Sequence, residues 1–329
     1  MLSRRGFMAG TLGGGMLLSA EALLRSPEVL AFPSNVLPQQ AGSDRVDWTK
    51  DSRWGLEYLR TNKQTVEWPN KARVAYMISV PFEMQDPGEQ PPENSVATSE
   101  YTYGGKEGVW RIMDILDRHK IKGDFIFNSI TAVVFPEAVK AIGDRGHGLI
   151  CHWWANNISQ SSASVEKDRE YILRTYAILE QVAGRKPVGW VAPGFGVGPK
   201  TLDIVAIDED QIMNSNNPDN DDLPFTVNYA GKKILAIPHS IILNDYSFTR
   251  THNPPSAYIE VLKSDFDRKY AEGASSPKLC NFIIHSHLSG RAFFADALDE
   301  LISYFRSFPE VWFTTREEIA SWWIKQNYL

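Results

Sequence analysis

The stretch Val109–Asn128, VWRIMDILDRHKIKGDFIFN, contains the pattern that decides the fold class. Apolar residues recur at intervals of three and four from Val109 to Leu116, which predicts an amphipathic helix. Gly123–Asn128 follows as a short, largely apolar run and predicts a buried strand. A helix followed directly by a strand is the building unit of α/β proteins.

The same alternation extends over most of the chain. The expected strands are Arg73–Val80, Gly123–Asn128, Gly148–Cys151, Val188–Val191, Gln211–Asn214, Leu279–Ile284 and Val311–Thr314. The expected helices lie over Val109–Leu116, from Pro136, over Val165–Ala183 with Gly184 as terminator, near Thr201–Ile207, within Ala257–Tyr270, over Phe293–Phe305 and after Thr315, with a hairpin turning at Ala230–Gly231. Thr315 and Glu318 form a capping-box pattern for the last helix.

This order of elements predicts a parallel sheet. Strands separated by helices of about ten or more residues pair in parallel through right-handed crossovers, which fits a barrel or a doubly wound sheet. No Gly-x-Gly-x-x-Gly follows the first expected strand, which weighs against a dinucleotide-binding sheet. We therefore expect an α/β barrel, in which residues just past the carboxyl ends of the strands converge on one face.

The N-terminal residues predict export. Ser3-Arg4-Arg5-Gly6-Phe7-Met8 precedes a short apolar stretch and the small-residue site Ala20-Glu21-Ala22, the order of a bacterial twin-arginine signal. The apolar stretch is shorter than the ~20 residues that span a bilayer. We expect a signal peptide over residues 1–22, an irregular segment over 23–70 and one barrel domain over 71–329. The mature protein would act in the periplasm or outside the cell without a stable membrane anchor.

Composition narrows the possible partners. The 329 residues carry a formal net charge of −6, which becomes −7 when cleavage after Ala22 removes two arginines and one glutamate. Nucleic acid is therefore not an expected partner. Cys151 and Cys280 adjoin apolar runs, which favours buried free thiols, although an oxidising compartment would permit one disulfide. The sequence does not indicate an oligomeric state.

Reactive side chains follow four of the expected strands. They are Glu83 after the first, His152 and Asn156 after Gly148–Cys151, Phe195 after Val188–Val191, and His285 and His287 after Leu279–Ile284. Their convergence predicts an active site, although a single histidine at a strand end is more often a hydrogen-bonded structural group. A carboxylate buried beside tryptophans has a raised pKa, which suits a general acid or base, and we expect this of Glu83.

These residues lie in segments that resemble the polysaccharide deacetylase superfamily, over roughly residues 70 to 325. GHGLICH at 146–152 is similar to the family's Gly-His-Glu-Ile-x-x-His segment, and VAPGFG at 191–196 to its Phe-Arg-Pro-Pro-Tyr-Gly segment. EGVWR at 107–111, NDDLPF at 220–225 and HSHLSGR at 285–291 more closely resemble the branch of metal-independent allantoinases and cyclic imide hydrolases. The resemblance implies a distorted (β/α) barrel that hydrolyses carbon–nitrogen bonds other than peptide bonds.

The sequence departs from the superfamily at the metal site. Metal-dependent members have an Asp-Asp pair after the first strand and a His-x-x-x-His motif, whereas Glu83-Met84 and Asn156 stand at those places and leave His152 alone. Catalytic zinc needs about three protein ligands. We expect no metal cofactor, with zinc held weakly through His152 as the alternative. Ala192 replaces the family arginine that orients the base, so other groups must position Glu83.

These observations lead to a mechanistic hypothesis. The protein would hydrolyse an amide or a cyclic imide or ureide bond in a small-molecule or carbohydrate substrate. Glu83 would activate water as general base, His285 would protonate the leaving nitrogen, and His152 and Asn156 would position or polarise the carbonyl. The candidates for substrate contact are Trp153, Trp154, Phe195, His287 and Asp222.

Other interpretations stay open. Glu83 could be an ion-paired rim residue, His152 and Asn156 could only hydrogen-bond strand ends, and Asp222 fits a solvated turn. Of two adjacent tryptophans, one usually belongs to the core and one to the rim. The alternative functions are a metal-dependent deacetylase of N-acetylated polysaccharide and a non-catalytic barrel that binds a carbohydrate or small molecule.

Overall fold

The computed structural model describes residues 66–88, 95–198, 200–205, 213–214, 222–229 and 232–328. All of them belong to one compact unit, Gln64–Leu329. The predicted signal peptide over residues 1–22 and the irregular segment up to residue 65 lie outside the described residues. Within the described part, no helix is long and apolar enough to span a membrane.

A parallel sheet organises the fold around β1 (Val74–Phe82). One edge of β1 pairs with β7 (Lys278–Ile283). The other edge is shared, because β8 (Val311–Thr314) pairs with Val74–Met77 and β2 (Asp124–Phe127) pairs with Ser79–Phe82. Beyond β2 lies β3 (Gly148–Cys151), again in parallel. The predicted parallel α/β arrangement is confirmed, and the succession of β8 and β2 along one edge distorts the barrel.

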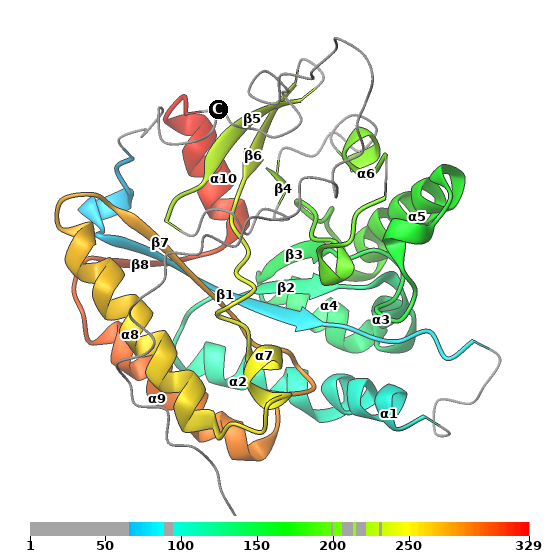
Figure 1. Ribbon diagram of the computed structural model, residues 1–329, viewed down its shortest axis with the longest axis horizontal. Helices are drawn as coiled ribbons and strands as arrows, with labels where there is room; N and C mark the ends of the chain where they lie inside the picture. The colour runs from blue at the N-terminus through cyan, green and yellow to red at the C-terminus, as the bar shows by residue number, and fades with distance from the viewer. Residues whose placement is uncertain are drawn as a thin grey trace, which may run out of the picture. The chain divides into compact units, whose positions relative to one another are not determined.

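A smaller sheet stands beside the first (Figure 1). Its central strand β6 (Lys232–Ala236) pairs in parallel with β4 (Met213–Asn214) and antiparallel with β5 (Phe225–Tyr229). The antiparallel pair confirms the predicted hairpin. Single parallel bridges, Cys151 to Trp190 and Asn244 to Ile283, continue the strand order on the two sides of the main sheet.

Helices surround the sheets. They are α1 (Val96–Tyr103), α2 (Val109–Arg118), α3 (Ser129–Val134), α4 (Pro136–Asp144), α5 (Val165–Ala183), α6 (Thr201–Asp203), α7 (Asp245–Thr249), α8 (Pro255–Gly273), α9 (Ala292–Arg306) and α10 (Arg316–Lys325). Short 3-10 turns lie at Pro69–Lys71, Gln160–Ser162 and Pro193–Phe195, and a π-helical turn, Gly104–Gly108, joins α1 to α2. Figure 1 shows α8 and α9 side by side next to β7.

The helix boundaries follow from local sequence. Ser164 caps α5 by accepting the Lys167 amide proton, and Gly184 ends the helix in the left-handed conformation at φ 77°. The predicted capping box of α10 is confirmed, because the Thr315 hydroxyl accepts the Glu318 amide proton while the Glu318 carboxylate accepts that of Thr315.

Side-chain alternation along the strands creates two cores. Ala75 and Met77 of β1 belong to an inner cluster with Leu279, Ile126 and residues of α10. The intervening residues of β1, such as Tyr76, pack outward against the surrounding helices. Beyond Met77, β1 continues to Phe82 and ends next to Glu83. Cys151 and Cys280 are both buried, as expected.

Candidate active site

Three of the predicted site residues come together at the carboxyl ends of β1, β3 and β7. Each continues the inner face of its strand: Glu83 follows Met77 by an even number of residues, His152 follows Ile150, and His285 follows Leu279. His152 Nε2 lies 3.0 Å from Glu83 Oε1, and His285 Nε2 lies 3.6 Å from Glu83 Oε2. The strand-end rule therefore predicted that these three side chains would meet.

Glu83 is held as an anion between the two imidazoles. Its side chain is buried, with only 4% of the residue exposed. Burial by itself raises the pKa of Glu83, but the positive charge of His285 and the hydrogen bond from His152 outweigh it and lower the pKa to about 2. The expected raised pKa was wrong, because tryptophan neighbours were assumed and histidine neighbours are found. These histidines also hold the Glu83 carboxylate in position. Ala192, which stands in place of the family arginine, has no polar side chain for that role.

His285 is anchored by a carboxylate that sequence reasoning missed. Asp245, at the start of α7, is 0% exposed. Its Oδ1 accepts the Nδ1–H of His285 at 2.6 Å, and its Oδ2 accepts the His285 backbone N–H at 2.8 Å and the Ser289 hydroxyl at 2.6 Å. Burial opposes a charge on His285, yet Asp245 and Glu83 outweigh it and raise the pKa of His285. The imidazole is therefore fixed in orientation and favoured in its protonated form.

A sequence signal for Asp245 existed. It follows the apolar run Ile241–Leu243, and the parallel bridge from Asn244 to Ile283 shows that this run lies beside β7. The residue thus obeys the same strand-end rule as Glu83, although 40 positions separate it from His285.

His152 faces Glu83, and Asn156 is hydrogen-bonded to Met84, the residue that follows Glu83. The Nδ1–H of His152 donates to the Val191 carbonyl oxygen at 2.5 Å, which leaves Nε2 to face Glu83. Asn156 is tied to the strand end by its backbone N–H, which donates to the Met84 carbonyl oxygen at 3.0 Å. Its side-chain Oδ1 is buried and accepts no hydrogen bond among the described residues.

The candidates for substrate contact divide into two groups. Phe195 has its ring centroid 5.4 Å from that of His239. His287 has its ring centroid 5.4 Å from that of His285 and 4.1 Å from that of Tyr101. Burial and the His285 charge lower the pKa of His287 to about 4.

The other candidates point away or lie elsewhere. Trp153 is 0% exposed and faces the outer core, one position out of phase with His152. Trp154 is half-buried, stacks on Tyr171 and donates its Nε1–H to Asp86 Oδ2 at 2.6 Å. Asp222 pairs with Lys278 at 2.6 Å, at the amino end of β7, and is therefore not brought to His285 at the opposite end.

Glycines of the π-helical turn hold the loop that follows β7. A Cβ atom at Gly108 would overlap the Ser286 carbonyl oxygen, and one at Gly104 would lie 2.7 Å from Ser286 Oγ. The loop between His285 and His287 therefore packs directly on bare backbone. This contact explains why a glycine is needed in the EGVWR segment. π-Helical turns such as this one recur at functional sites.

The residues present do not fit the metal site of the superfamily's metal-dependent members. Met84 lies on the opposite face from Glu83, in an apolar cluster with Tyr101 and Ile130. Among the residues that the structure describes, no three His, Cys, Asp or Glu side chains are arranged to hold a metal ion. His152 already directs one nitrogen to a carbonyl oxygen and the other to Glu83.

Comparisons with known proteins agree with this geometry. Residues 89–207 match the profile of the family described as polysaccharide deacetylase. A Schizosaccharomyces pombe protein whose name assigns it to the polysaccharide deacetylases is 24% identical over 302 residues, which cover 79% of this chain and 92% of the relative. A Bacillus cereus peptidoglycan-N-acetylglucosamine deacetylase is 27% identical over 50% of each chain.

Solved structures extend the likeness to the whole domain. PuuE allantoinase is 28% identical with a TM-score of 0.72, covering 80% of this chain and 94% of that one. A Pseudomonas aeruginosa structure assigned as a polysaccharide deacetylase is 27% identical with a TM-score of 0.74, covering 82% and 97%. Residues 89–207 thus match the polysaccharide deacetylase family, and the domain has an α/β barrel-like fold similar to these two structures. The predicted class of enzyme, a polysaccharide deacetylase-like hydrolase of carbon–nitrogen bonds other than peptide bonds, is confirmed.

Proposed function

We propose that this protein is an exported, metal-independent hydrolase of an amide or a cyclic imide or ureide bond. The observation that carries the proposal is the buried row Asp245, His285, Glu83 and His152, in which a carboxylate base and an imidazolium acid face each other. The likeness to PuuE allantoinase over 80% of the chain supports ureide-type substrates. The likeness to peptidoglycan deacetylases and the Arg4-Arg5 signal support a site of action outside the cytoplasm.

The proposed reaction uses the negative charge of Glu83 and the positive charge of His285. Glu83 takes a proton from water while the water oxygen bonds to the carbonyl carbon of the substrate. The carbon–nitrogen bond then breaks, and the leaving nitrogen takes the proton that His285 carries on Nε2. Glu83 returns its proton to His285, whose Nε2 lies 3.6 Å from Glu83 Oε2 in the resting site. One water is consumed, and the products are a carboxylic acid and an amine or amide nitrogen.

The proton affinities of the two groups are linked. A carboxylate with a pKa near 2 is a weak base, but the charge of His285 is what holds the pKa of Glu83 so low against the opposing effect of burial. When His285 gives its proton to the leaving nitrogen, that charge disappears and the pKa of Glu83 rises. Departure of the leaving group therefore favours proton uptake by the base.

The polar atoms around Glu83 suit a substrate that contains N–H groups. The buried Oδ1 of Asn156 lacks a hydrogen-bond donor among the described residues and would accept one from an imide or ureide nitrogen. His152 would keep Glu83 in place through its Nε2. His287 would flank the substrate, because its ring lies next to that of His285. We expect Phe195, next to His239, to contact the substrate as well.

A substrate panel tests the proposal. Cyclic imides, ureides and N-acetylated sugars should be offered to the purified protein with and without a chelator. We expect chelator-resistant turnover of an imide, ureide or amide, reduced about 10²-fold or more by Glu83→Gln and retained by the exposed control Glu137→Gln. Turnover only of N-acetylated sugar with added metal would instead support a metal-dependent deacetylase, which the family match over residues 89–207 favours. Binding without turnover would support the non-catalytic barrel.

A further inference from the structure

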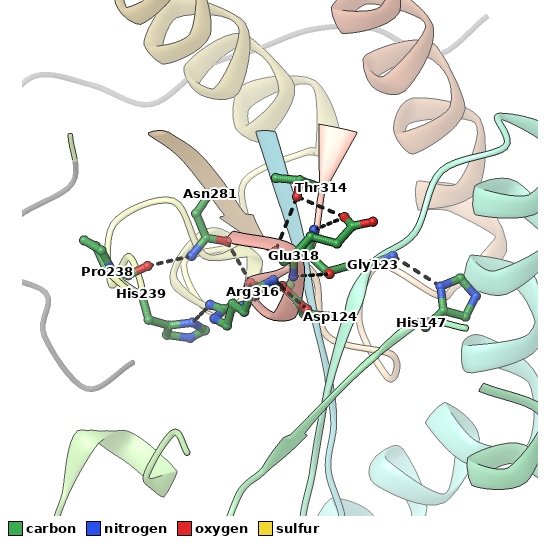
Figure 2. A network of polar contacts seen from close by, with 11 residues as sticks. Gly123, Asp124, His147, Pro238, His239, Asn281, Thr314, Arg316 and Glu318 are labelled. Carbon is green, nitrogen blue, oxygen red and sulfur yellow. Dashed lines mark hydrogen bonds and ion pairs between the residues drawn. The ribbon is translucent and has the colours of Figure 1, made fainter. Parts of the chain in front are cut away.

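Polar side chains on the inner faces of β1 and β7 form a layer that precedes the site along both strands. Figure 2 shows the network of polar contacts to which this layer belongs. Ser79 is four residues before Glu83 on the inner face of β1, and Asn281 is four residues before His285 on that of β7. The Ser79 hydroxyl donates to Asn281 Oδ1 at 2.7 Å, and the Asn281 amide donates to the Pro238 carbonyl oxygen at 3.0 Å. The layer therefore links β1 and β7 to the loop after β6.

Arg316 is the centre of this layer. It begins α10, is fully buried and binds Asp124, the first residue of β2, with NH1 3.0 Å from Oδ2. The same NH1 donates to Ser79 Oγ at 2.8 Å. This contact lies where β1 passes from pairing with β8 to pairing with β2, so the arginine fills the seam of the distorted barrel.

The second guanidinium nitrogen fixes the state of a histidine. Arg316 NH2 lies 2.9 Å from His239 Nδ1, and a guanidinium can only donate hydrogen bonds. His239 Nδ1 must therefore accept, which leaves the proton of the neutral imidazole on Nε2. Burial, then the charges of Arg316, His152 and His285, lower the pKa of His239 well below its usual range. Figure 2 shows the ring at the edge of the layer, with its contact to Arg316 as a dashed line.

The place of His239 connects the layer to the site. The residue follows β6, is 4% exposed and has its ring centroid 5.4 Å from that of Phe195. His152 and His285 are close enough to act on it electrostatically. With Nδ1 turned to Arg316, the Nε2–H is directed away from the layer, and it has no second acceptor among the described residues.

The site needs such a donor. The carbonyl oxygen of an amide or imide gains negative charge when water attacks, and preorganised donors that meet this oxygen are often the largest single contribution to catalysis. The nitrogens of His152 are engaged by Val191 and Glu83, and the Nδ1 of His285 is engaged by Asp245, while its Nε2 serves the leaving nitrogen. His287 has a buried Nδ1 with no partner among the described residues, so no contact fixes its tautomer. The contact of His239 with Arg316, in contrast, fixes its N–H at Nε2.

We propose that the His239 Nε2–H donates a hydrogen bond to the substrate carbonyl oxygen and stabilises the oxyanion of the tetrahedral intermediate, with Arg316 and Asp124 as positioning residues. This inference rests on the proposed function. A neutral imidazole in a fixed tautomer is an effective electrophile, because it donates without adding a cation that would compete with His285 for Glu83.

Two variants separate the donor from the packing. In His239→Gln the side-chain oxygen can accept from Arg316 and the amide can donate to the substrate, whereas His239→Met has similar length and no donor. We expect His239→Met to lower kcat by about 10²- to 10³-fold with little change in KM. His239→Gln should recover at least ten-fold of that loss. Both variants should keep the limbs of the pH profile, because these belong to Glu83 and His285.

A measurement on the unaltered protein gives a second test. In ¹⁵N-labelled wild type, the His239 side chain should show the Nε2–H tautomer and should not titrate between about pH 5 and 9. Three results would overturn this inference but not the proposed function. They are an Nδ1–H tautomer of His239, titration of His239 in this pH range, and a His239→Met protein with kcat within three-fold of wild type. Absence of wild-type turnover on every carbon–nitrogen substrate would overturn the proposed function and this inference together.

Discussion

The Asp245→Asn substitution tests how His285 acquires its role as acid. The carboxylate is 0% exposed and lies 2.6 Å from His285 Nδ1, so solvent does not screen its charge. Removing an opposite charge at this range lowers the pKa of a histidine by about 1 to 3, which corresponds to about 1.4 to 4 kcal/mol. The alkaline limb of kcat/KM, set by the raised pKa of His285, should therefore move to lower pH by at least about one unit.

The amide also disturbs the hydrogen bonds. Asp245 accepts from three donors, the backbone and side chain of His285 and the Ser289 hydroxyl, while asparagine offers one acceptor oxygen and an NH₂ group. In Asp245→Asn, either one of these three buried donors is left without an acceptor, or the His285 imidazole adopts the other tautomer. We expect a loss of about 1 to 3 kcal/mol in the free energy of unfolding and a fall in kcat of about 10²-fold or more.

Rate profiles and thermal unfolding, each recorded from pH 5 to 10, provide the assay. In the wild type, the raised pKa of His285 gives stability that is present below pH 6.5 and is lost as the pH rises through the folded-state value. This alkaline loss of stability should shrink in Asp245→Asn. Asp267→Asn, an exposed carboxylate on α8, is the control and should change neither profile. An unchanged alkaline limb in Asp245→Asn would refute the role given to Asp245.

Three further predictions follow from the same geometry and sequence. Purified protein should hold less than one zinc per chain after dialysis, because Met84 and Asn156 supply no strong ligand; one stable ion that is lost in His152→Ala would show the opposite. Lys in place of Arg4 and Arg5 should keep the precursor in the cytoplasm, and an unchanged periplasmic yield would contradict the twin-arginine prediction. Gly108→Ala should lower the melting temperature and weaken activity, because its Cβ overlaps the Ser286 carbonyl oxygen; a wild-type melting curve would show that the loop has room to move.

The sequence alone predicted which side chains of the candidate site would meet, because strand ends and side-chain alternation are local properties. Glu83, His152 and His285 each continue the inner face of a strand that the apolar pattern had predicted. The same alternation explains why Trp153 turns into the outer core, and applying it one residue further would have separated Trp153 from His152. Asp222 was misplaced because its pairing with Lys278 at the amino end of β7 depends on register across the sheet, which no local pattern reports.

The electrostatics of the site could not be read from the sequence. Whether burial or charge decides the pKa of Glu83 depends on two histidines that lie 69 and 202 positions away in the chain. Asp245 and the Arg316 layer are likewise assembled from distant segments. Residue types at strand ends predict which groups meet, whereas distances and hydrogen-bond partners decide what charge each group carries.

A double-mutant cycle on Glu83 and His285 tests the shared mechanism most directly. On a substrate that the wild type hydrolyses, Glu83→Gln and His285→Ala should each lower kcat by about 10²-fold or more, with the folded state retained in thermal unfolding. Because both residues act in one reaction, the double variant should lose far less than the product of the two single effects. Full hydrolysis by Glu83→Gln, or losses that multiply in the double variant, would contradict the account.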